Sequence, residues 1–206
     1  MSVMRRTTDA DVPQAIMQKA LKSAADATFN TLNVDGATST NDTAMLLASG
    51  KRGSPDGQEF ADAILSACRE LTMMMARDAE GMTRIAHLTV TGASSDEEAR
   101  IAAKNIVENN LVKCSWYGGD PYWGRLMAAA GSAGVDLDVG KSFVAYGGIK
   151  IAKAGTAIDH DGQALAEHMM GDEVQIEVHL GAGHGSARMI GIDLGPGYIK
   201  ENSKTS

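Results

Sequence analysis

The strongest constraint on the fold is a strict alternation of apolar and polar residues over Glu173–Leu180. In an extended chain, Val174, Ile176 and Val178 lie on one face, and the polar side chains that alternate with them lie on the other. Ile85–Thr91 has a similar pattern, and it predicts a second strand. A strand with one polar face belongs to a sheet that other elements cover on one side.

Helical patterns separate the predicted strands. Apolar residues recur every three or four positions in the longer segments, and Ser95 with Glu98 forms a capping box at the start of one of them. Helices are expected at about 11–29, 54–75, 95–109, 122–130 and 161–170. Helices and strands therefore intermix along the chain.

Short apolar runs predict the remaining strands, at 44–48, 112–116, 143–146, 149–152 and 186–194. The runs at 143–146 and 149–152 are predicted to pair as a hairpin across Gly147 and Gly148. The glycine-rich stretch Gly181–Gly185 is interpreted as a hairpin loop between two strands, because no helix follows it to favour phosphate binding. Arg5 and Arg6 disfavour a strand in the first residues.

These patterns predict an α+β fold, a layered α/β sandwich with mixed and antiparallel strands. The 206 residues suit a single unit spanning 1–206, or two small lobes, and are enough to bury a substantial core. The tail from Tyr198 onward is polar, and no element is predicted there.

Composition excludes several classes of function. The net charge of −7 opposes binding to phosphate backbones, so no nucleic acid partner is expected. No apolar stretch approaches the roughly 20 residues of a membrane span, and the first residues lack the apolar core of a signal peptide. The two cysteines, Cys68 and Cys114, have no spacing typical of a disulfide framework or a metal site. A cytoplasmic protein is therefore expected.

A polar run, Asp35–Thr43, precedes the apolar run at 44–48. Its hydroxyl, amide and carboxylate side chains suit a connector in which they bond their own backbone. The same residues suit a ligand-facing loop held against a buried strand. The spacing leaves both interpretations open.

The polar run and the blocks after it resemble the C-terminal (β) chain of ornithine acetyltransferase, also known as the arginine-biosynthesis bifunctional glutamate N-acetyltransferase. The resemblance covers nearly the whole chain, from about Thr7 onward. The matching blocks, in the family's order, are Asp35–Thr43, Asp78–Arg84, Val90–Ala93, Ser95–Ala99, Leu111–Lys113, Asp120–Arg125, Gly134–Asp136, Gly185–Ala187, Gly191–Leu194 and Tyr198–Asn202.

This resemblance implies an N-acetyltransferase of arginine biosynthesis. In the family, a precursor cuts itself before a threonine, and the new N-terminal hydroxyl accepts acetyl from N-acetylornithine and passes it to glutamate without a metal. The α-amino group of the same residue, with a pKa of about 8, is a built-in base. The resemblance also implies an α chain as partner, which carries the oxyanion donors and a substrate-binding lysine, in a heterotetramer of α and β chains. Acetyl-CoA as an alternative donor is left open.

The family's nucleophile position falls on Met1, which has no hydroxyl. The alternatives are an isolated β segment given a start codon, a natural split gene, and a non-catalytic relative. In a variant of the split gene, loss of Met1 leaves Ser2 as the nucleophile. The first alternative is preferred, and the isolated chain is expected to be inactive and to associate with itself.

The resemblance assigns substrate binding to three positions. Glu80 matches the family's glutamate that binds the amino-acid portion of the substrate, and a carboxylate suits the ammonium groups of ornithine. Asn202 matches a substrate-binding asparagine near the end of the chain. Ser206, or its neighbour Thr205, is the candidate for a terminal hydroxyl. The alternative functions are a non-catalytic assembly or binding protein, and an N-terminal-nucleophile amidohydrolase that uses Ser2.

Overall fold

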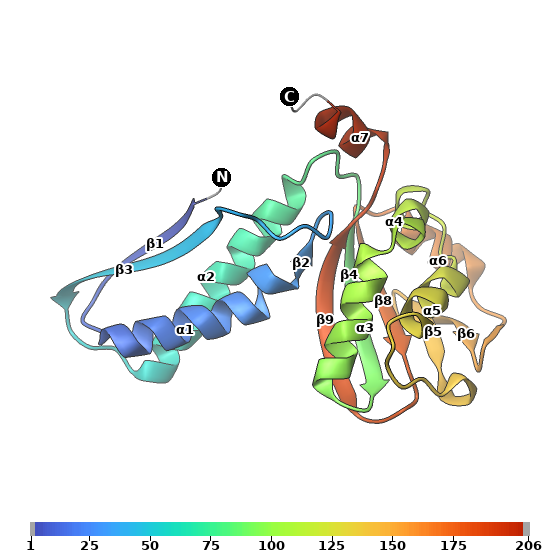
Figure 1. Ribbon diagram of the computed structural model, residues 1–206, viewed down its shortest axis with the longest axis horizontal. Helices are drawn as coiled ribbons and strands as arrows, with labels where there is room; N and C mark the ends of the chain where they lie inside the picture. The colour runs from blue at the N-terminus through green and yellow to red at the C-terminus, as the bar shows by residue number, and fades with distance from the viewer. Residues whose placement is uncertain (1–2, 204–206) are drawn as a thin grey trace. The chain divides into compact units, whose positions relative to one another are not determined.

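The computed structural model describes residues 3–203, and this part of the chain forms two compact units. The first unit contains the chain up to Leu32 and Ala37–Met75, and the second contains Asn33–Gly36 and the chain from Ala76 onward. Figure 1 shows the elements of each unit. No helix among the described residues is long and apolar enough to cross a membrane.

The first unit packs two helices against a small parallel sheet. Its strands are β1 (Val3–Ala10) and β3 (Thr43–Arg52), and its helices are α1 (Gln14–Ala27) and α2 (Gly57–Arg77), whose last residues enter the second unit. A one-turn helix, η1 (Phe29–Thr31), follows α1. The buried core of this unit consists of Ala20, Ala24, Phe60, Ile64 and Cys68.

Two predictions for this unit were wrong in part. The first residues do form a strand, because the guanidinium of Arg6 reaches the edge of the core and donates from Nη2 to the carbonyl oxygen of Ala67 at 3.1 Å. The run at 44–48 is a strand but is not buried. Leu46 packs on the helices, while Met45 and Leu47 are exposed because the helices of this unit cover one face of β3.

The second unit contains a mixed sheet of seven strands within the described residues, in the order β2-β9-β4-β8-β5-β6-β7. The strand β4 is parallel to β8 and antiparallel to β9, and β5 runs antiparallel to both β8 and β6. The strands are β2 (Leu32–Asn33), β4 (Ile85–Ala93), β5 (Phe143–Tyr146), β6 (Ile149–Lys153), β7 (Thr156–Ala157), β8 (Glu173–His179) and β9 (Gly185–Ile192). The predicted α+β architecture with mixed strands is confirmed.

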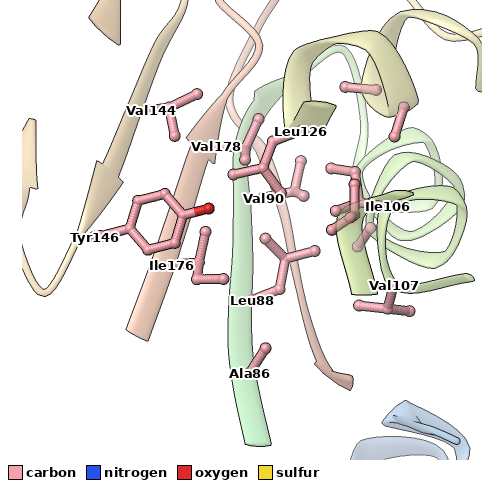
Figure 2. Close-up of a cluster of buried hydrophobic side chains, with 14 of the residues drawn as sticks. Ala86, Leu88, Val90, Ile106, Val107, Leu126, Val144, Tyr146, Ile176 and Val178 are labelled. Carbon is pink, nitrogen blue, oxygen red and sulfur yellow. The ribbon is translucent and has the colours of Figure 1, made fainter. Parts of the chain in front are cut away.

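Helices pack on one face of this sheet (Figure 1). Apolar side chains of β4, among them Leu88 and Val90, meet Ile106 and Val107 of the neighbouring helix in a buried cluster (Figure 2). The helices that contribute to this core are α3 (Asp96–Glu108), α4 (Asn110–Tyr117), α5 (Trp123–Gly131) and α6 (Gly162–Met169). The unit also contains the one-turn helix η2 (Val139–Lys141) and the helix α7 (Pro196–Asn202), which has no buried residue. The serine half of the predicted capping box is present, since Ser95 Oγ accepts from the backbone nitrogen of Glu98 at 3.2 Å.

The predicted strand at 112–116 is instead the helix α4. Asn109 ends α3 and also caps α4, because its side chain accepts from the backbone nitrogens of Leu111 and Val112. A short apolar run has the same composition in a buried helix as in a buried strand, so its periodicity did not distinguish the two.

The glycine-rich stretch at 181–185 is not a hairpin loop. The strands β8 and β9 each pair with β4, which lies between them, so the stretch crosses over the end of β4. A Cβ added at Gly183 would lie 2.6 Å from the carbonyl oxygen of Ala93, and one at Gly185 would lie 2.1 Å from the carbonyl carbon of Ser95. The glycines are required because this crossing passes directly against the turn between β4 and α3.

Candidate substrate-binding site

The turn that contains Glu80 packs directly against the start of α7. Gly81 has φ +67°, and a Cβ added there would lie 2.1 Å from the backbone nitrogen of Tyr198. From the other side, a Cβ at Gly197 would lie 2.9 Å from the Cα of Gly81. Two glycines therefore allow the turn and the helix to approach each other backbone to backbone.

This approach brings two predicted site residues together. Asn202 donates a hydrogen bond from Nδ2 to Glu80 Oε2 at 2.7 Å, although 122 positions separate them in the chain. The same nitrogen lies 3.1 Å from the carbonyl oxygen of Tyr198, one helical turn earlier in α7. Both side chains are exposed. The pair presents the carboxylate of Glu80, an acceptor that suits the ammonium group of an amino acid.

Asp193 fixes the other end of the turn. It follows β9, is 3% exposed, and accepts hydrogen bonds from the backbone nitrogens of Thr83 at 2.9 Å and Arg84 at 3.1 Å. The hydroxyl of Thr83 donates to its second oxygen. A buried carboxylate is tolerated where several donors satisfy it. The segment between Glu80 and β4 is thereby tied to the segment that leads into α7.

Sequence reasoning gave no role to three residues next to this pair. The hydroxyl of Tyr198 donates to Asp35 Oδ2 at 3.3 Å. Burial, followed by the charge of Asp35, raises the pKa of Tyr198 above its usual range. Lys113 is 3% exposed and donates from Nζ to the carbonyl oxygen of Val34. All three lie in blocks that resemble the family, and this was the only signal in the sequence.

The structure does not test the predictions for the two ends of the chain. Met1, Ser2, Thr205 and Ser206 lie outside the described residues, so their assignments stay predictions. In the polar run, the residues from Asp35 to Thr43 are exposed, and Ser39 Oγ accepts from the backbone nitrogens of Asn41 and Asp42. These local bonds are of the kind expected for a connector.

Metal ligands are not gathered at this site or elsewhere in residues 3–203, where no group of three or more His, Cys, Asp or Glu side chains is placed to hold a metal ion. The groups available at the site are therefore carboxylates, an amide, a phenol and a buried ammonium. They can bind and orient a polar ligand. An acyl-transfer nucleophile is not among the groups described here.

Comparisons with known proteins agree along the whole chain. A model described as the ArgJ family matches residues 3–206. The arginine biosynthesis bifunctional protein ArgJ of Mycolicibacterium paratuberculosis is 41% identical over 201 residues, which are 97% of this chain and 49% of that protein. The ArgJ protein of Geobacillus kaustophilus is 37% identical over 204 residues, 96% of this chain and 50% of that protein.

A solved structure agrees with these matches. The crystal structure of the arginine biosynthesis bifunctional protein ArgJ from Bacillus halodurans has a TM-score of 0.90 and 34% identity, and the match covers 98% of this chain and 99% of that chain. The chain spans about half the length of the curated relatives it matches. The match to the family model over nearly every residue shows that this chain belongs to the ArgJ family.

Proposed function

We propose that this chain is the C-terminal (β) half of an acetyltransferase that moves acetyl from N-acetylornithine to glutamate in arginine biosynthesis. The names of the relatives support the pathway. One structural observation carries the proposal: Glu80 and Asn202, which the family resemblance assigns to substrate binding, are joined by a hydrogen bond of 2.7 Å.

The proposed roles follow from the chemistry of the pair. The carboxylate of Glu80 binds the α-ammonium group of the substrate, and Asn202 holds Glu80 in place by donating from Nδ2. A hydroxyl at the N-terminus of the β half attacks the acetyl carbonyl, and the ornithine amine leaves with a proton. The amine of glutamate then attacks the acetyl ester and releases the hydroxyl.

The nucleophile position of this polypeptide lacks the hydroxyl group that the proposed reaction needs. The family resemblance aligns that position with Met1, and a thioether cannot form the acetyl ester. We expect a polypeptide with Met1 in place to be inactive, and one with a hydroxyl residue there to be active. If Met1 is removed and the register is tolerated, the hydroxyl of Ser2 is the alternative nucleophile.

A partner is part of the proposal. The oxyanion donors and the substrate-binding lysine of the family belong to its α half, so the working site needs a second polypeptide segment. We propose an assembly of α and β halves in the cytoplasm, with N-acetylornithine and glutamate as substrates. Acetyl-CoA as donor is tested in the same assay.

The experiment combines this chain with the α half of the Mycolicibacterium paratuberculosis relative and measures acetyl transfer from N-acetylornithine, or from acetyl-CoA, to glutamate. The unchanged sequence is compared with a Met1→Thr variant processed to expose that threonine. Transfer by Met1→Thr together with an acetyl adduct in its intact mass supports the proposal. Transfer by the unchanged sequence with an adduct on Ser2 assigns the nucleophile to that serine. Binding of the α half without transfer in any arm would instead support a non-catalytic assembly protein.

A further inference from the structure

Lys113 is a buried cation for which the proposed chemistry has no use. It lies on α4, is 3% exposed, and donates to the carbonyl oxygen of Val34. Burial lowers the pKa of Lys113, while the carboxylates of Asp35, Asp193 and Glu108 oppose this shift, in that order. A buried ammonium group is costly unless opposite charges and hydrogen bonds compensate it.

Two of these carboxylates hold segments on either side of the site. Asp35 accepts the hydroxyl of Tyr198 at 3.3 Å and so contacts α7. Asp193 accepts the backbone nitrogen of Thr83 at 2.9 Å and so holds the end of the turn that contains Glu80. The backbone nitrogen of the next residue, Leu194, donates to the carbonyl oxygen of Lys113 at 3.3 Å.

The third carboxylate holds the segment that carries Asp35. Glu108 Oε1 accepts from Asn33 Nδ2 at 3.2 Å, next to the Val34 carbonyl that Lys113 itself binds. Gly36 follows with φ +82°, and a Cβ added there would be 3.5 Å from Cγ of Glu108. The short segment from Asn33 to Gly36 is therefore bound to α3 through Glu108 and to α4 through Lys113. The same segment contacts α7 through Asp35.

We propose that Lys113 is the positioning residue of the Glu80–Asn202 site, because its hydrogen bond to the carbonyl oxygen of Val34 holds the adjacent Asp35 where that carboxylate anchors α7 through Tyr198. When the ammonium group is lost, the carboxylates around it repel one another and the carbonyl of Val34 loses its donor. The helix α7 then loosens, and Asn202 leaves Glu80. The effect on substrate rests on the proposed function, whereas the effect on α7 does not.

The first test is hydrogen–deuterium exchange of the full chain. Lys113→Met, which keeps the length and removes the charge, is expected to speed exchange in residues 196–203 by roughly tenfold, the size expected for the loss of one hydrogen bond from a local opening. Lys104→Met is the matched control, because Lys104 is an exposed lysine that also faces Glu108, at 3.7 Å, but lies on α3. Unchanged exchange of α7 in a folded Lys113→Met protein would overturn the proposal.

A double variant tests whether Lys113 acts through Asp35. Adding Asp35→Asn to Lys113→Met changes the group through which Lys113 is proposed to act, so exchange of α7 in the double variant is expected to match that of Asp35→Asn alone. If Lys113 acts on α7 by another route, the effects of the two substitutions add, and this result would contradict the proposal. Should Lys113→Met fail to fold, Tyr198→Phe tests the same link with the charges intact, and unchanged exchange of α7 in that variant would refute it.

The catalytic consequence is measured in the complex with the α half and the Met1→Thr nucleophile. Lys113→Met is expected to raise KM for N-acetylornithine by about tenfold with a smaller change in kcat, because binding groups are displaced and the nucleophile is not. A fall in kcat alone would contradict this. If the parent complex transfers no acetyl, the proposed function fails, and the exchange results still decide the role of Lys113.

Discussion

Gly81 meets the backbone of Tyr198 so closely that a Cβ on the glycine would lie 2.1 Å from that residue's nitrogen. The obstacle is main chain, which cannot rotate aside as a flexible side chain does. This contact is where the turn containing Glu80 and the helix containing Asn202 join. The site therefore depends on a glycine that itself contributes no functional group.

The first prediction concerns this contact. Gly81→Ala should destabilise the chain by about 3 kcal/mol or more, since left-handed strain and a backbone clash add up. Gly134→Ala is the control, because Gly134 has φ +74° but a Cβ there meets nothing within 4 Å. It should show the conformational strain alone, about 1 kcal/mol. Urea unfolding of both variants measures the difference, and equal losses would mean that the contact is loose in solution.

The second prediction concerns Glu80. In the active complex, Glu80→Gln should raise KM for N-acetylornithine about tenfold or more, because a charge-assisted hydrogen bond to the substrate ammonium becomes a neutral one. Glu201→Gln removes an exposed carboxylate beside Asn202 on the same helix and should leave KM unchanged. Steady-state kinetics of both variants measure KM for N-acetylornithine. Equal effects of the two variants would point to general charge attraction and not to a specific contact.

The third prediction concerns Glu173, on the polar face of the sheet. Arg77 first, and His87 second, hold the pKa of Glu173 below its ordinary value through hydrogen bonds of 2.9 Å. The unfolded chain therefore binds this proton more readily than the folded one. The stability from Glu173 is present above the unfolded pKa of about 4.3 and is lost as pH falls through the lower folded pKa.

Glu173→Gln should accordingly lower the free energy of unfolding at pH 7 by less than about 1 kcal/mol, since the carboxylate is partly exposed and solvent screens it. The difference from the parent should shrink as acid is added. Glu97→Gln breaks a more exposed pair with Arg100 and is the control, with a weaker pH dependence expected. Urea unfolding across the acid range tests this, and a difference that persists at low pH would show a packing effect.

The fourth prediction concerns the two cysteines. Cys68 is 2% exposed in the core of the first unit, and burial raises the pKa of its thiol, whereas Cys114 is exposed. A thiol reagent should therefore modify Cys114 at least about tenfold faster than Cys68 in the native chain, with equal rates in denaturant. Cys114→Ser should abolish the fast phase. Two fast thiols in the native protein would mean that the first unit opens readily.

The elements that could be predicted from the sequence are those with a local signal, such as side-chain alternation or a helix cap. The alternation from Glu173 to Leu180 predicted β8 and its polar face, because side chains of a strand alternate whatever its neighbours are. The capping box at Ser95 fixed the start of α3 for the same reason, since a cap acts within one turn. The helix α7 and the strand β1 were missed, because their stability comes from contacts with distant segments and not from their own pattern.

The pairing and packing of those elements could be seen only in the tertiary structure. Periodicity did not reveal that 112–116 is helical, or that β4 lies between β8 and β9, because pairing depends on segments far apart in the chain. For the site, the family resemblance identified Glu80 and Asn202 one at a time. Their contact, and the burial of Lys113, arise from long-range packing, since the burial of a charge is defined by its surroundings and has no signature in the sequence.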